Sequence, residues 1–377
     1  MTEWKEGILS EISDITMGQS PKGESCNNIG NGEPLLNGPT EFGLKYPDPV
    51  QFTTEPTKNC KEGDILFCVR GSTTGRMNWA NKEYVIGRGL AAFRHKKGLG
   101  YQYFLKGLID YKLDFLLASA TGSTFPNVSR ELLENMEIHL PPLPEQRAIA
   151  GVLSSLDDKI DLLHRQNKTL EAMAEALFRQ WFVEEADAGW ERRPLSGIAT
   201  FLNGLACQKF PPENKIEKLP VLKIRELSGG ISGDSDWATS KIENQYIVHS
   251  GDVIFSWSAS LIVKMWDGVP CILNQHLFKV TSNEYPKWFY FNWCRFHLAE
   301  FISISSSHAT TMGHIKRGDL DNAMVVIPPL VQIEQMNLVM EPLLNHNISN
   351  SAQIKSLEAL RDTLLPKLMS GEVRVAI

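Results

Sequence analysis

With 377 residues, of which 42% are hydrophobic and 22% are charged, the chain has the composition of a globular protein with room for two or three domains, which argues against disorder. A formal net charge of −6 argues against a surface that is basic throughout, as in proteins that coat nucleic acid. No apolar run approaches the length of a membrane helix, and the start MTEWKEGILSEISD lacks the features of a signal peptide, so we expect a cytoplasmic protein with no membrane partner.

The first predicted element is a mixed domain over residues 1–143. Short apolar runs at 64–69 and 135–140 are typical of strands, and clusters of Gly, Pro, Asn and Ser such as GQSPKGES divide them. This alternation predicts an α+β domain with long loops. The Gly-Asp pair at the start of the first run is typical of a turn, so we do not expect Asp64 to be a catalytic carboxylate.

A long helix is predicted for residues 144–186, after the proline pair of the segment LPPLPEQRAIAGVL. Its apolar residues alternate spacings of four and three, which is a heptad seam. The seam consists of Leu153, Leu156, Ile160, Leu163, Asn167 and Leu170, and continues at its ends with Ile149, Ala174, Leu177 and Trp181. Because proline can neither continue the preceding strand nor stand inside a helix, the pair separates domain from helix.

The second half of the chain repeats the first at an offset of 186–188 residues. GDILF recurs as GDVIF, and TFPNVSRELLENMEIHLPPL recurs as TMGHIKRGDLDNAMVVIPPL. We therefore expect a second mixed domain over residues 187–330, with strands at 253–257 and 323–327, and a second long helix over residues 331–377. The second seam consists of Met340, Leu343, Asn347, Ile354 and Leu357, with Met336, Asn350, Arg361, Leu364 and Leu368 in the same pattern.

A heptad seam needs a partner, and the simplest partner is the other copy in the same chain. The expected fold class is α+β, with two similar mixed α/β domains separated by a pair of long antiparallel coiled-coil helices and an internal pseudo-two-fold symmetry. Asn167 and Asn347 on the seams fit a register-fixing role. Ordinary amphipathic bundle helices are the alternative, although globular helices rarely run beyond roughly 20 residues.

Motifs for catalysis are missing from the sequence. It contains neither a GxxxxGK[ST] phosphate loop nor a GxGxxG cofactor loop, and LPPL and IPPL lack the amide or carboxylate and the aromatic residue of an amino-methyltransferase. The six cysteines are scattered without metal-ligand spacing, so we expect reduced, mostly buried thiols and no metal site. The chain is predicted to bind and position a partner, without a cofactor of its own.

Loops after the predicted strands carry side chains suited to double-stranded DNA. Arginine suits guanine edges, Asn and Gln suit adenine, and Ser, Thr and Lys suit phosphates. The candidates in the first domain are Lys22, Arg70, Ser72, Thr73, Arg76, Arg88, Ser123, Thr124 and Asn127. Those in the second are Lys223, Arg225, Ser258, Lys264, Asn274, Gln275, His276, Thr310 and Lys316. Solvated loops remain the alternative for any single residue, and capping or turn roles remain open for the segments 121–128 and 307–315.

The full length of the chain resembles the specificity subunit of type I restriction-modification enzymes. The resemblance rests on two variable domains, each ending in a PPLxEQ-like hinge (LPPLPEQRAIAGVL and IPPLVQIEQ), on the following helix with TLEAMAEALFRQWF, and on the C-terminal LLPKLMSGEVRV. The second hinge departs from the pattern, because Val331, Gln332 and Ile333 precede Glu334. Arg361 on the second seam is also unusual.

The resemblance implies a non-catalytic DNA-recognition subunit. Each of its two target recognition domains would read one half of a bipartite, asymmetric site, and the helices would set the spacer and dock the modification subunits. In the family, two modification subunits carry S-adenosylmethionine and methylate adenine, and restriction subunits join to cleave DNA. A helix of about 35 residues spans roughly 50 Å, which is compatible with major-groove faces one DNA turn apart.

Two other functions stay open at the level of sequence. A self-sufficient DNA methyltransferase would transfer methyl groups without other subunits, which the missing cofactor loop argues against. A coiled-coil scaffold that binds only proteins would be indifferent to DNA sequence when its partner subunits are present.

Overall fold

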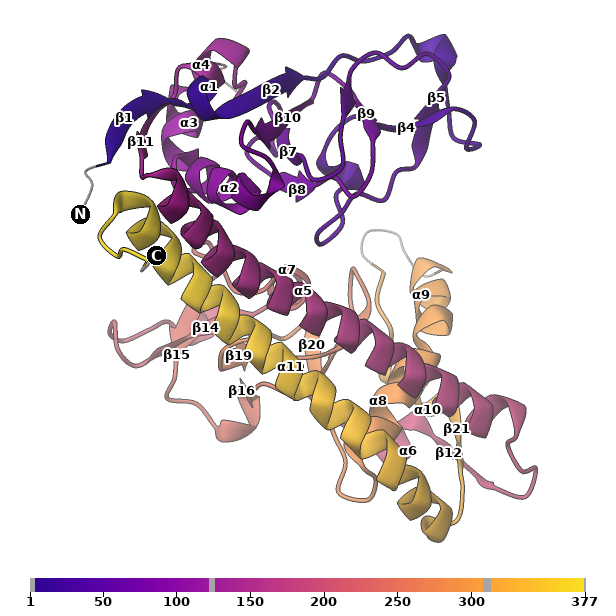
Figure 1. The fold of residues 1–377 in the computed structure, drawn as a ribbon. Coiled ribbons are helices and arrows are strands. Elements are labelled where there is room, and N and C mark those ends of the chain that lie inside the picture. The colour runs from indigo at the N-terminus through magenta and orange to yellow at the C-terminus, as the bar shows by residue number, and fades with distance from the viewer. Residues whose placement is uncertain (1–3, 122–125, 308–312, 376–377) are drawn as a thin grey trace. The chain divides into compact units, whose positions relative to one another are not determined.

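The computed structural model describes residues 4–121, 126–307 and 313–375, which fold as two units. Unit 1 consists of Met1–Leu162 together with Ser356–Ile377, and unit 2 consists of Leu163–Lys355. Both boundaries fall inside the long helices α5 (Leu143–Arg179) and α11 (Leu330–Ser370) (Figure 1). Each unit therefore contains one mixed domain and a stretch of both helices.

The described mixed domain of unit 1 contains three sheets. Strands β1 (Lys5–Ile8) and β11 (Glu137–Leu140) pair antiparallel, a four-stranded antiparallel sheet has the order β2-β10-β7-β8, and a five-stranded sheet has the order β3-β5-β4-β9-β6 with one parallel pair, β4 and β9. The other elements are α1 (Leu9–Ile12), β2 (Ser13–Met17), η1 (Gly23–Ser25), β3 (Cys26–Asn27), β4 (Glu33–Leu36), η2 (Pro39–Glu41), β5 (Gln51–Thr53), β6 (Asn59–Cys60), β7 (Ile65–Cys68), β8 (Met77–Trp79), β9 (Tyr84–Ile86), β10 (Leu90–His95), η3 (Leu99–Tyr101), α2 (Gln102–Tyr111), α3 (Leu113–Ser119) and α4 (Arg130–Glu134).

Unit 2 repeats this plan. Strands β12 (Glu191–Pro194) and β21 (Met324–Ile327) pair antiparallel, a four-stranded antiparallel sheet has the order β13-β20-β17-β18, and a second four-stranded sheet has the order β15-β14-β19-β16 with β14 and β19 parallel. The other elements are the π-helix η4 (Gln180–Glu184), α6 (Leu195–Ile198), β13 (Thr200–Asn203), η5 (Cys207–Lys209), β14 (Lys218–Leu222), α7 (Ile224–Gly229), β15 (Trp237–Thr239), η6 (Asn244–Tyr246), β16 (Ile247–Val248), β17 (Val253–Ser256), β18 (Ile262–Met265), β19 (Cys271–Leu273), β20 (Leu277–Thr281), α8 (Lys287–Phe296), α9 (Leu298–Ser307) and α10 (Arg317–Asn322).

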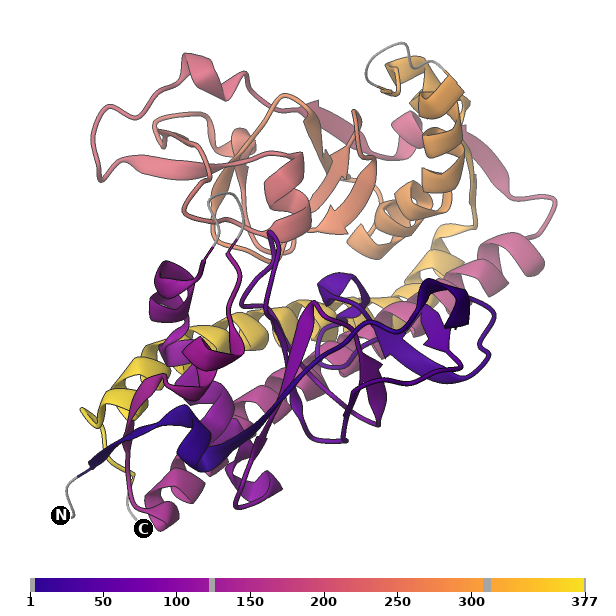
Figure 2. The ribbon, with the colours of Figure 1, turned by 90° about the horizontal axis from the view of Figure 1, so that it is seen from above.

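Strand β7 is buried on both faces, which explains why its sequence is a continuous apolar run. Successive side chains of a strand point to opposite faces. Ile65 and Phe67 accordingly join the core that contains α2, whereas Leu66 and Cys68 join the core toward the five-stranded sheet. Strand β17 divides its side chains in the same way between two cores, and α8 packs against its sheet (Figure 2).

The Gly-Asp turn has the same geometry in both units. Gly63 and Gly251 adopt positive φ angles of 82° and 87°, which glycine tolerates without a steric penalty. The carboxylates of Asp64 and Asp252 each accept the backbone N–H three positions earlier, at 2.7 and 2.8 Å. These contacts confirm that both aspartates serve turn chemistry.

The expected fold class is confirmed by the order of elements and sheets. The predicted strands at 64–69, 135–140, 253–257 and 323–327 correspond to β7, β11, β17 and β21. Prolines precede both long helices, and their carbonyls accept the first helical N–H groups: Pro142 from Glu145 at 2.9 Å, and Pro329 from Gln332 at 2.8 Å. The division of the sequence at residues 143, 186 and 330 stays a prediction of the domain boundaries.

The helices pair antiparallel within each unit, because residues with higher numbers on α5 contact residues with lower numbers on α11. In unit 1, Arg361 lies 3.1 Å from Asp157. In unit 2, Asn167 donates to Ser351 at 3.1 Å, and Asn347 donates to Glu171 at 3.1 Å. Both seam asparagines thus hydrogen-bond across the pair, and the unusual Arg361 has a carboxylate partner.

The seams are covered by protein. The buried seam residues are Leu153, Ile160, Leu163, Met340, Asn347 and Ile354, and the partly buried ones are Leu156, Asn167, Leu170, Leu343 and Leu357. The helices are also part of the cores of the mixed domains. Gly107 of α2 allows a close approach in unit 1, because a Cβ there would lie 2.8 Å from Leu153 and 3.0 Å from Leu365.

The first hinge contains a buried polar cluster. Gln146 donates to the carbonyl of Pro141 at 2.9 Å and its Oε1 lies 3.3 Å from Nε2 of His95, while Gln102 accepts the N–H of His95 at 2.7 Å. At the second hinge the position of Gln146 is taken by the buried apolar Ile333. Lys287, the first residue of α8, corresponds to Gln102, and it donates to the carbonyl of Gly251 at 2.7 Å as Gln102 does to that of Gly63 at 2.9 Å. The departure of the second hinge from the motif is therefore an exchange of polar for apolar packing.

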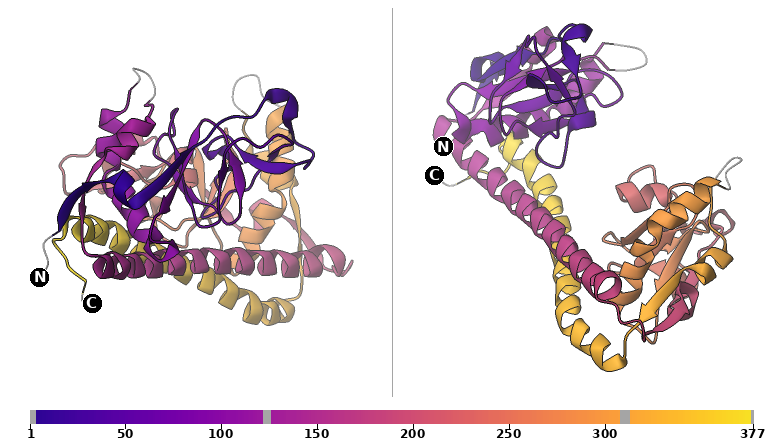
Figure 3. Two further views of the ribbon diagram at one scale, coloured as in Figure 1. Left: turned by 45° about the horizontal axis from the view of Figure 1, so that its top comes forward. Right: turned by 90° about the vertical axis from the view of Figure 1, so that its right-hand side faces the viewer.

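The described ends of the chain meet in unit 1 (Figure 3). The guanidinium of Arg374 lies 5.7 Å from the ring centroid of Trp4 and forms a bidentate pair with the buried carboxylate of Glu145, with Nη2 2.6 Å from Oε2. None of the six cysteines is in a disulfide, and five of them are buried. Among the helices of the described ranges, none is both long enough and apolar enough to cross a membrane.

Candidate nucleic-acid interface

In unit 1, four loops meet at one end of the four-stranded sheet, and we call residues 18–22, 69–76, 87–89 and 126–128 the first edge. The backbone N–H of Val69 donates to the carbonyl of Gly89 at 2.9 Å, and the carbonyl of Val69 accepts the N–H of Val128 at 2.8 Å. Arg88 donates its N–H to Oγ of Ser20 at 3.2 Å. The loops are therefore joined to one another by hydrogen bonds.

The first edge is cationic. It carries Lys22, Arg70, Arg76 and Arg88 and no Asp or Glu. All four side chains are exposed, and within the described ranges none forms an ion pair. Three more candidates, Ser72, Thr73 and Asn127, belong to these loops. Asn127 is the bridge partner of Arg70, so the structure brings these two predicted residues together.

Unit 2 builds a corresponding second edge from residues 204–208, 257–261, 274–276 and 313–315. The backbone N–H of Trp257 donates to the carbonyl of His276 at 3.4 Å, and the carbonyl of Trp257 accepts the N–H of Ile315 at 3.0 Å. Val69 makes the corresponding two hydrogen bonds in unit 1. Ser258 and His314 form an isolated antiparallel bridge, as Arg70 and Asn127 do. The two edges share one backbone arrangement.

The second edge contains no Asp, Glu, Lys or Arg. Its polar groups are linked through an imidazole: Gln275 Nε2 lies 3.3 Å from Nε2 of His276, and Oγ of Ser258 lies 3.1 Å from Nδ1. Because an amide nitrogen can only donate, His276 Nε2 accepts and its Nδ1–H donates to Ser258. The buried Asn274 accepts the N–H of His276 at 3.3 Å. The candidates Ser258, Asn274, Gln275 and His276 thus form one cluster.

One left-handed backbone position also recurs in both edges. Gly71 follows Arg70 with a φ of 95°, and Ala259 follows Ser258 with a φ of 55°. Ala259 is the non-glycine residue with positive φ among the residues described, and this conformation costs an alanine about 1–2 kcal/mol. The second edge therefore keeps the left-handed turn of the first edge, although the Cβ of Ala259 makes this conformation unfavourable.

The other described candidates of the second domain lie outside the second edge. Lys223 pairs with Asp236, and this hydrogen bond holds the pKa of Asp236 below its usual value. Arg225 lies 2.7 Å from the buried Glu226. The exposed Lys316 precedes α10 and donates its N–H to a carboxylate at 2.6 Å. The candidates Ser123, Thr124 and Thr310 lie outside the described residues.

Lys264 is separated from the second edge by the strand register. It faces Ile254, as Asn78 faces Leu66 in unit 1, because the loop before β18 is shorter than the loop before β8. The sequence analysis had placed Lys264 in a loop after a predicted strand. Lys264 therefore corresponds to Asn78 inside the sheet.

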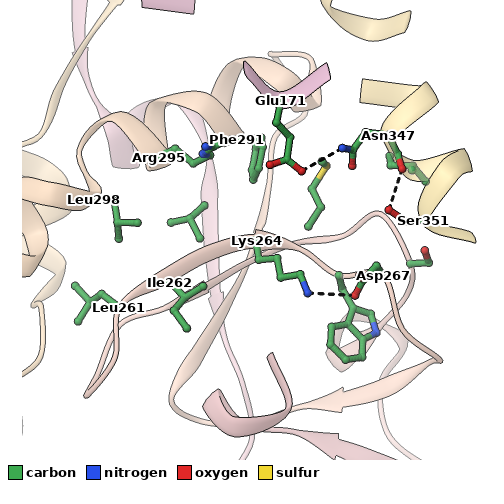
Figure 4. Close-up of a pocket in the computed structure, with 15 residues that line it drawn as sticks. Glu171, Leu261, Ile262, Lys264, Asp267, Phe291, Arg295, Leu298, Asn347 and Ser351 are labelled. Atoms are coloured by element: carbon green, nitrogen blue, oxygen red, sulfur yellow. Dashed lines mark hydrogen bonds and ion pairs between the residues drawn. The ribbon is translucent and has the colours of Figure 1, made fainter. Parts of the chain in front are cut away.

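Lys264 lines a cavity of 400 Å³ in unit 2, between β18, α8 and the adjoining stretches of α5 and α11 (Figure 4). Lys264 lies 3.3 Å from Asp267, and Glu171 on the opposite side accepts a hydrogen bond from Asn347. Arg295 lies 3.3 Å from Glu175. Because the charged groups of this wall already have partners, we assign the candidate interface to the edges.

Sequence reasoning missed one residue of the second edge, Trp257, whereas His314 belongs to the segment 307–315 whose role it left open. Trp257 was assigned to the end of a strand, but its ring packs 5.8 Å from Phe278 and 5.9 Å from His276, and its Nε1 donates to Asn203 at 3.1 Å. His314 lies 6.5 Å from Trp257. The signal available was an aromatic residue that directly precedes a serine-rich loop.

Comparison with known sequences matches both halves of the chain to one family. The model of the family described as type I restriction modification DNA specificity domain matches residues 1–172 and 187–359. The MjaIX type I restriction enzyme specificity subunit of Methanocaldococcus jannaschii is 27% identical over 99% of this chain and 94% of its own. The HindI specificity subunit of Haemophilus influenzae is 19% identical over 99% of this chain and 100% of its own.

A solved structure shares the fold. The crystal structure of a type I restriction-modification system S subunit from M. genitalium has a TM-score of 0.60 and 18% sequence identity to this chain. The match covers 97% of this chain and 96% of that one. The repeated order of mixed domain and long helix is therefore a fold that this chain shares with that solved structure.

Proposed function

The chain belongs to the type I restriction-modification DNA specificity family, and from this premise we propose that each unit reads one half of a bipartite, asymmetric DNA site through its edge. The observation that carries the proposal is the pair of matched edges. Both use the same backbone hydrogen bonds, yet their exposed side chains differ in charge and size. A common backbone arrangement that carries different side chains in the two units suits direct recognition of different base edges.

The cationic first edge supports a role in contacting DNA despite the acidic total. Phosphate neutralisation by Lys and Arg supplies most non-specific affinity, and three loops of the first edge present four of these groups without an Asp or Glu. The second edge offers hydroxyl, amide and imidazole groups, which carry base preference but little electrostatic attraction. On this proposal, the candidates in the loops are the readers, and the paired Lys223, Arg225 and Lys264 contribute less.

We further infer that the chain is non-catalytic and works in a complex. Two modification subunits would dock on the paired helices, carry S-adenosylmethionine and methylate adenine, and restriction subunits would join them to cleave DNA. The helices would set the spacer between the two half-sites. Their lengths of 37 and 41 residues correspond to roughly 55 and 60 Å, which supports this role.

The test is to map methylated positions on genomic DNA in cells with the modification subunits, with and without this chain. The proposal expects a two-part motif that appears only with the chain. Replacing residues 70–76 should change one part and leave the other intact. Methylation without sequence preference would favour the protein-binding scaffold instead, and methylation by the purified chain without partners would favour a self-sufficient methyltransferase.

A further inference from the structure

Three positions of the edges are matched by backbone contacts and differ in chemistry. The bridge between Arg70 and Asn127 corresponds to the bridge between Ser258 and His314. The third position is Arg88 in unit 1. It precedes Gly89, whose carbonyl accepts from Val69, just as Gln275 precedes His276, whose carbonyl accepts from Trp257.

In unit 1, two of the three positions hold arginine. Both guanidinium groups are exposed and form no ion pair with the described residues. The backbone of Arg88 is held by its hydrogen bond to Ser20, and that of Arg70 by the bridge to Asn127. A guanidinium group on a fixed backbone can donate two parallel hydrogen bonds to O6 and N7 of guanine, which is the commonest specific contact in the major groove.

In unit 2, the position of Arg88 is taken by a positioned amide. One N–H of Gln275 Nε2 is donated to His276, which in turn donates to Ser258. The second N–H and Oε1 of Gln275 form no hydrogen bond with the described residues, and the side chain is partly exposed. One donor and one acceptor side by side complement N7 and N6 of adenine.

We propose that the two edges read different bases from matched positions: unit 1 recognises guanine through Arg70 and Arg88, and unit 2 recognises adenine through Gln275, which Ser258 and His276 hold in place. This inference rests on the function proposed above. It adds which base each half-site requires and which side chain requires it. Arginine also binds phosphates, and a phosphate contact would leave base preference unchanged, so the two roles can be separated.

The experiment exchanges the matched side chains in the full chain, co-expressed with its modification subunits. Methylated motifs are mapped for the wild type, Arg88→Gln and Gln275→Arg. The wild type should require guanine in the half-site of unit 1 and adenine in that of unit 2. Arg88→Gln should shift one position from guanine toward adenine, and Gln275→Arg should shift one position from adenine toward guanine, each by roughly tenfold or more.

Each variant contains its own control, because the half-site of the unmodified unit must stay unchanged and so reports an assembled complex. Should an exchange variant give no methylation, Arg88→Ala and Gln275→Ala replace it, and each must relax one base in one half-site. A two-part wild-type motif that survives these changes without any altered base overturns the inference and leaves the proposed function intact. A wild type without a two-part motif overturns the proposed function itself.

Discussion

His95 Nε2 donates a hydrogen bond to Oε1 of Gln146 over 3.3 Å, and Nδ1 of the same ring accepts the N–H of Lys97 at 3.1 Å. The imidazole is buried and its two contacts require the neutral form. Burial lowers the pKa of His95 from its ordinary value of 6.5. The first hinge therefore contains a group that the unfolded chain protonates more readily than the folded one.

This relationship predicts an acid sensitivity of unit 1. A lowered folded pKa means that the stabilisation is fully present above pH 6.5 and is lost as the pH falls toward the folded pKa, because only the unfolded state then takes up the proton. His95→Gln, which cannot titrate, should flatten the fall in unfolding free energy below pH 6.5. Denaturant titrations at several pH values measure this, with the exposed His346→Gln as control. An unchanged slope in His95→Gln would assign the acid sensitivity to other groups.

The left-handed Ala259 predicts a gain in stability on substitution. Ala259→Gly removes the steric conflict at φ 55° but adds freedom to the unfolded chain, so we expect the free energy of unfolding to rise by about 0.5–1 kcal/mol. Ala172→Gly in the exposed middle of α5 is the matched control and should lower it by about 1 kcal/mol. Chemical denaturation of both variants measures these changes in the free energy of unfolding. If both substitutions destabilise equally, the turn is not strained.

The pair between Arg374 and Glu145 predicts a strong dependence of unit 1 on the segment that follows α11. Glu145 is 2% exposed, so Arg374→Ala would leave a buried carboxylate without its partner and should cost about 3 kcal/mol of unfolding free energy. The double variant with Glu145→Gln should recover part of that loss, since the buried charge is gone. Equilibrium unfolding of the single and double variants measures the difference. A double variant no more stable than Arg374→Ala would show that packing on Trp4, rather than charge, is what Arg374 supplies.

The contrast between Lys22 and Lys223 predicts different salt dependence. Lys22 is exposed on the first edge without a carboxylate partner in the described ranges, whereas Lys223 is paired with Asp236. Lys22→Ala should reduce the slope of log affinity against log salt by about 1 and leave the preferred sequence unchanged, as expected for a phosphate contact. Lys223→Ala should change the slope less. Binding of the complex to duplex DNA at several salt concentrations tests both, and a larger effect of Lys223→Ala would exclude this assignment.

Features that depend on residues close together in the sequence were predictable, and features that depend on distant residues were not. The strand at Ile65–Cys68 and the helices after the proline pairs were predictable, because apolar periodicity and proline act within a few residues. The repeat also predicted which loops would correspond. It could not predict that Lys264 falls inside the sheet, because strand register depends on loop length and on the partner strand. The imidazole link from Gln275 to Ser258 was equally hidden, because these residues are 17 positions apart in the sequence and only the fold brings their side chains together.

Lengthening both helices tests whether they set the spacer. Asp157 meets Arg361 in unit 1 and Asn167 meets Ser351 in unit 2, so insertions after residues 162 and 355 fall at the same level of the pair. One heptad inserted at both places keeps the seam in register and adds about 10 Å, equivalent to about 3 base pairs. The methylated motif should keep both half-sites and gain that spacer. Four residues inserted at both places break the heptad pattern and should abolish the motif, whereas an unchanged spacer after the heptad insertion would mean that the partner subunits set the distance.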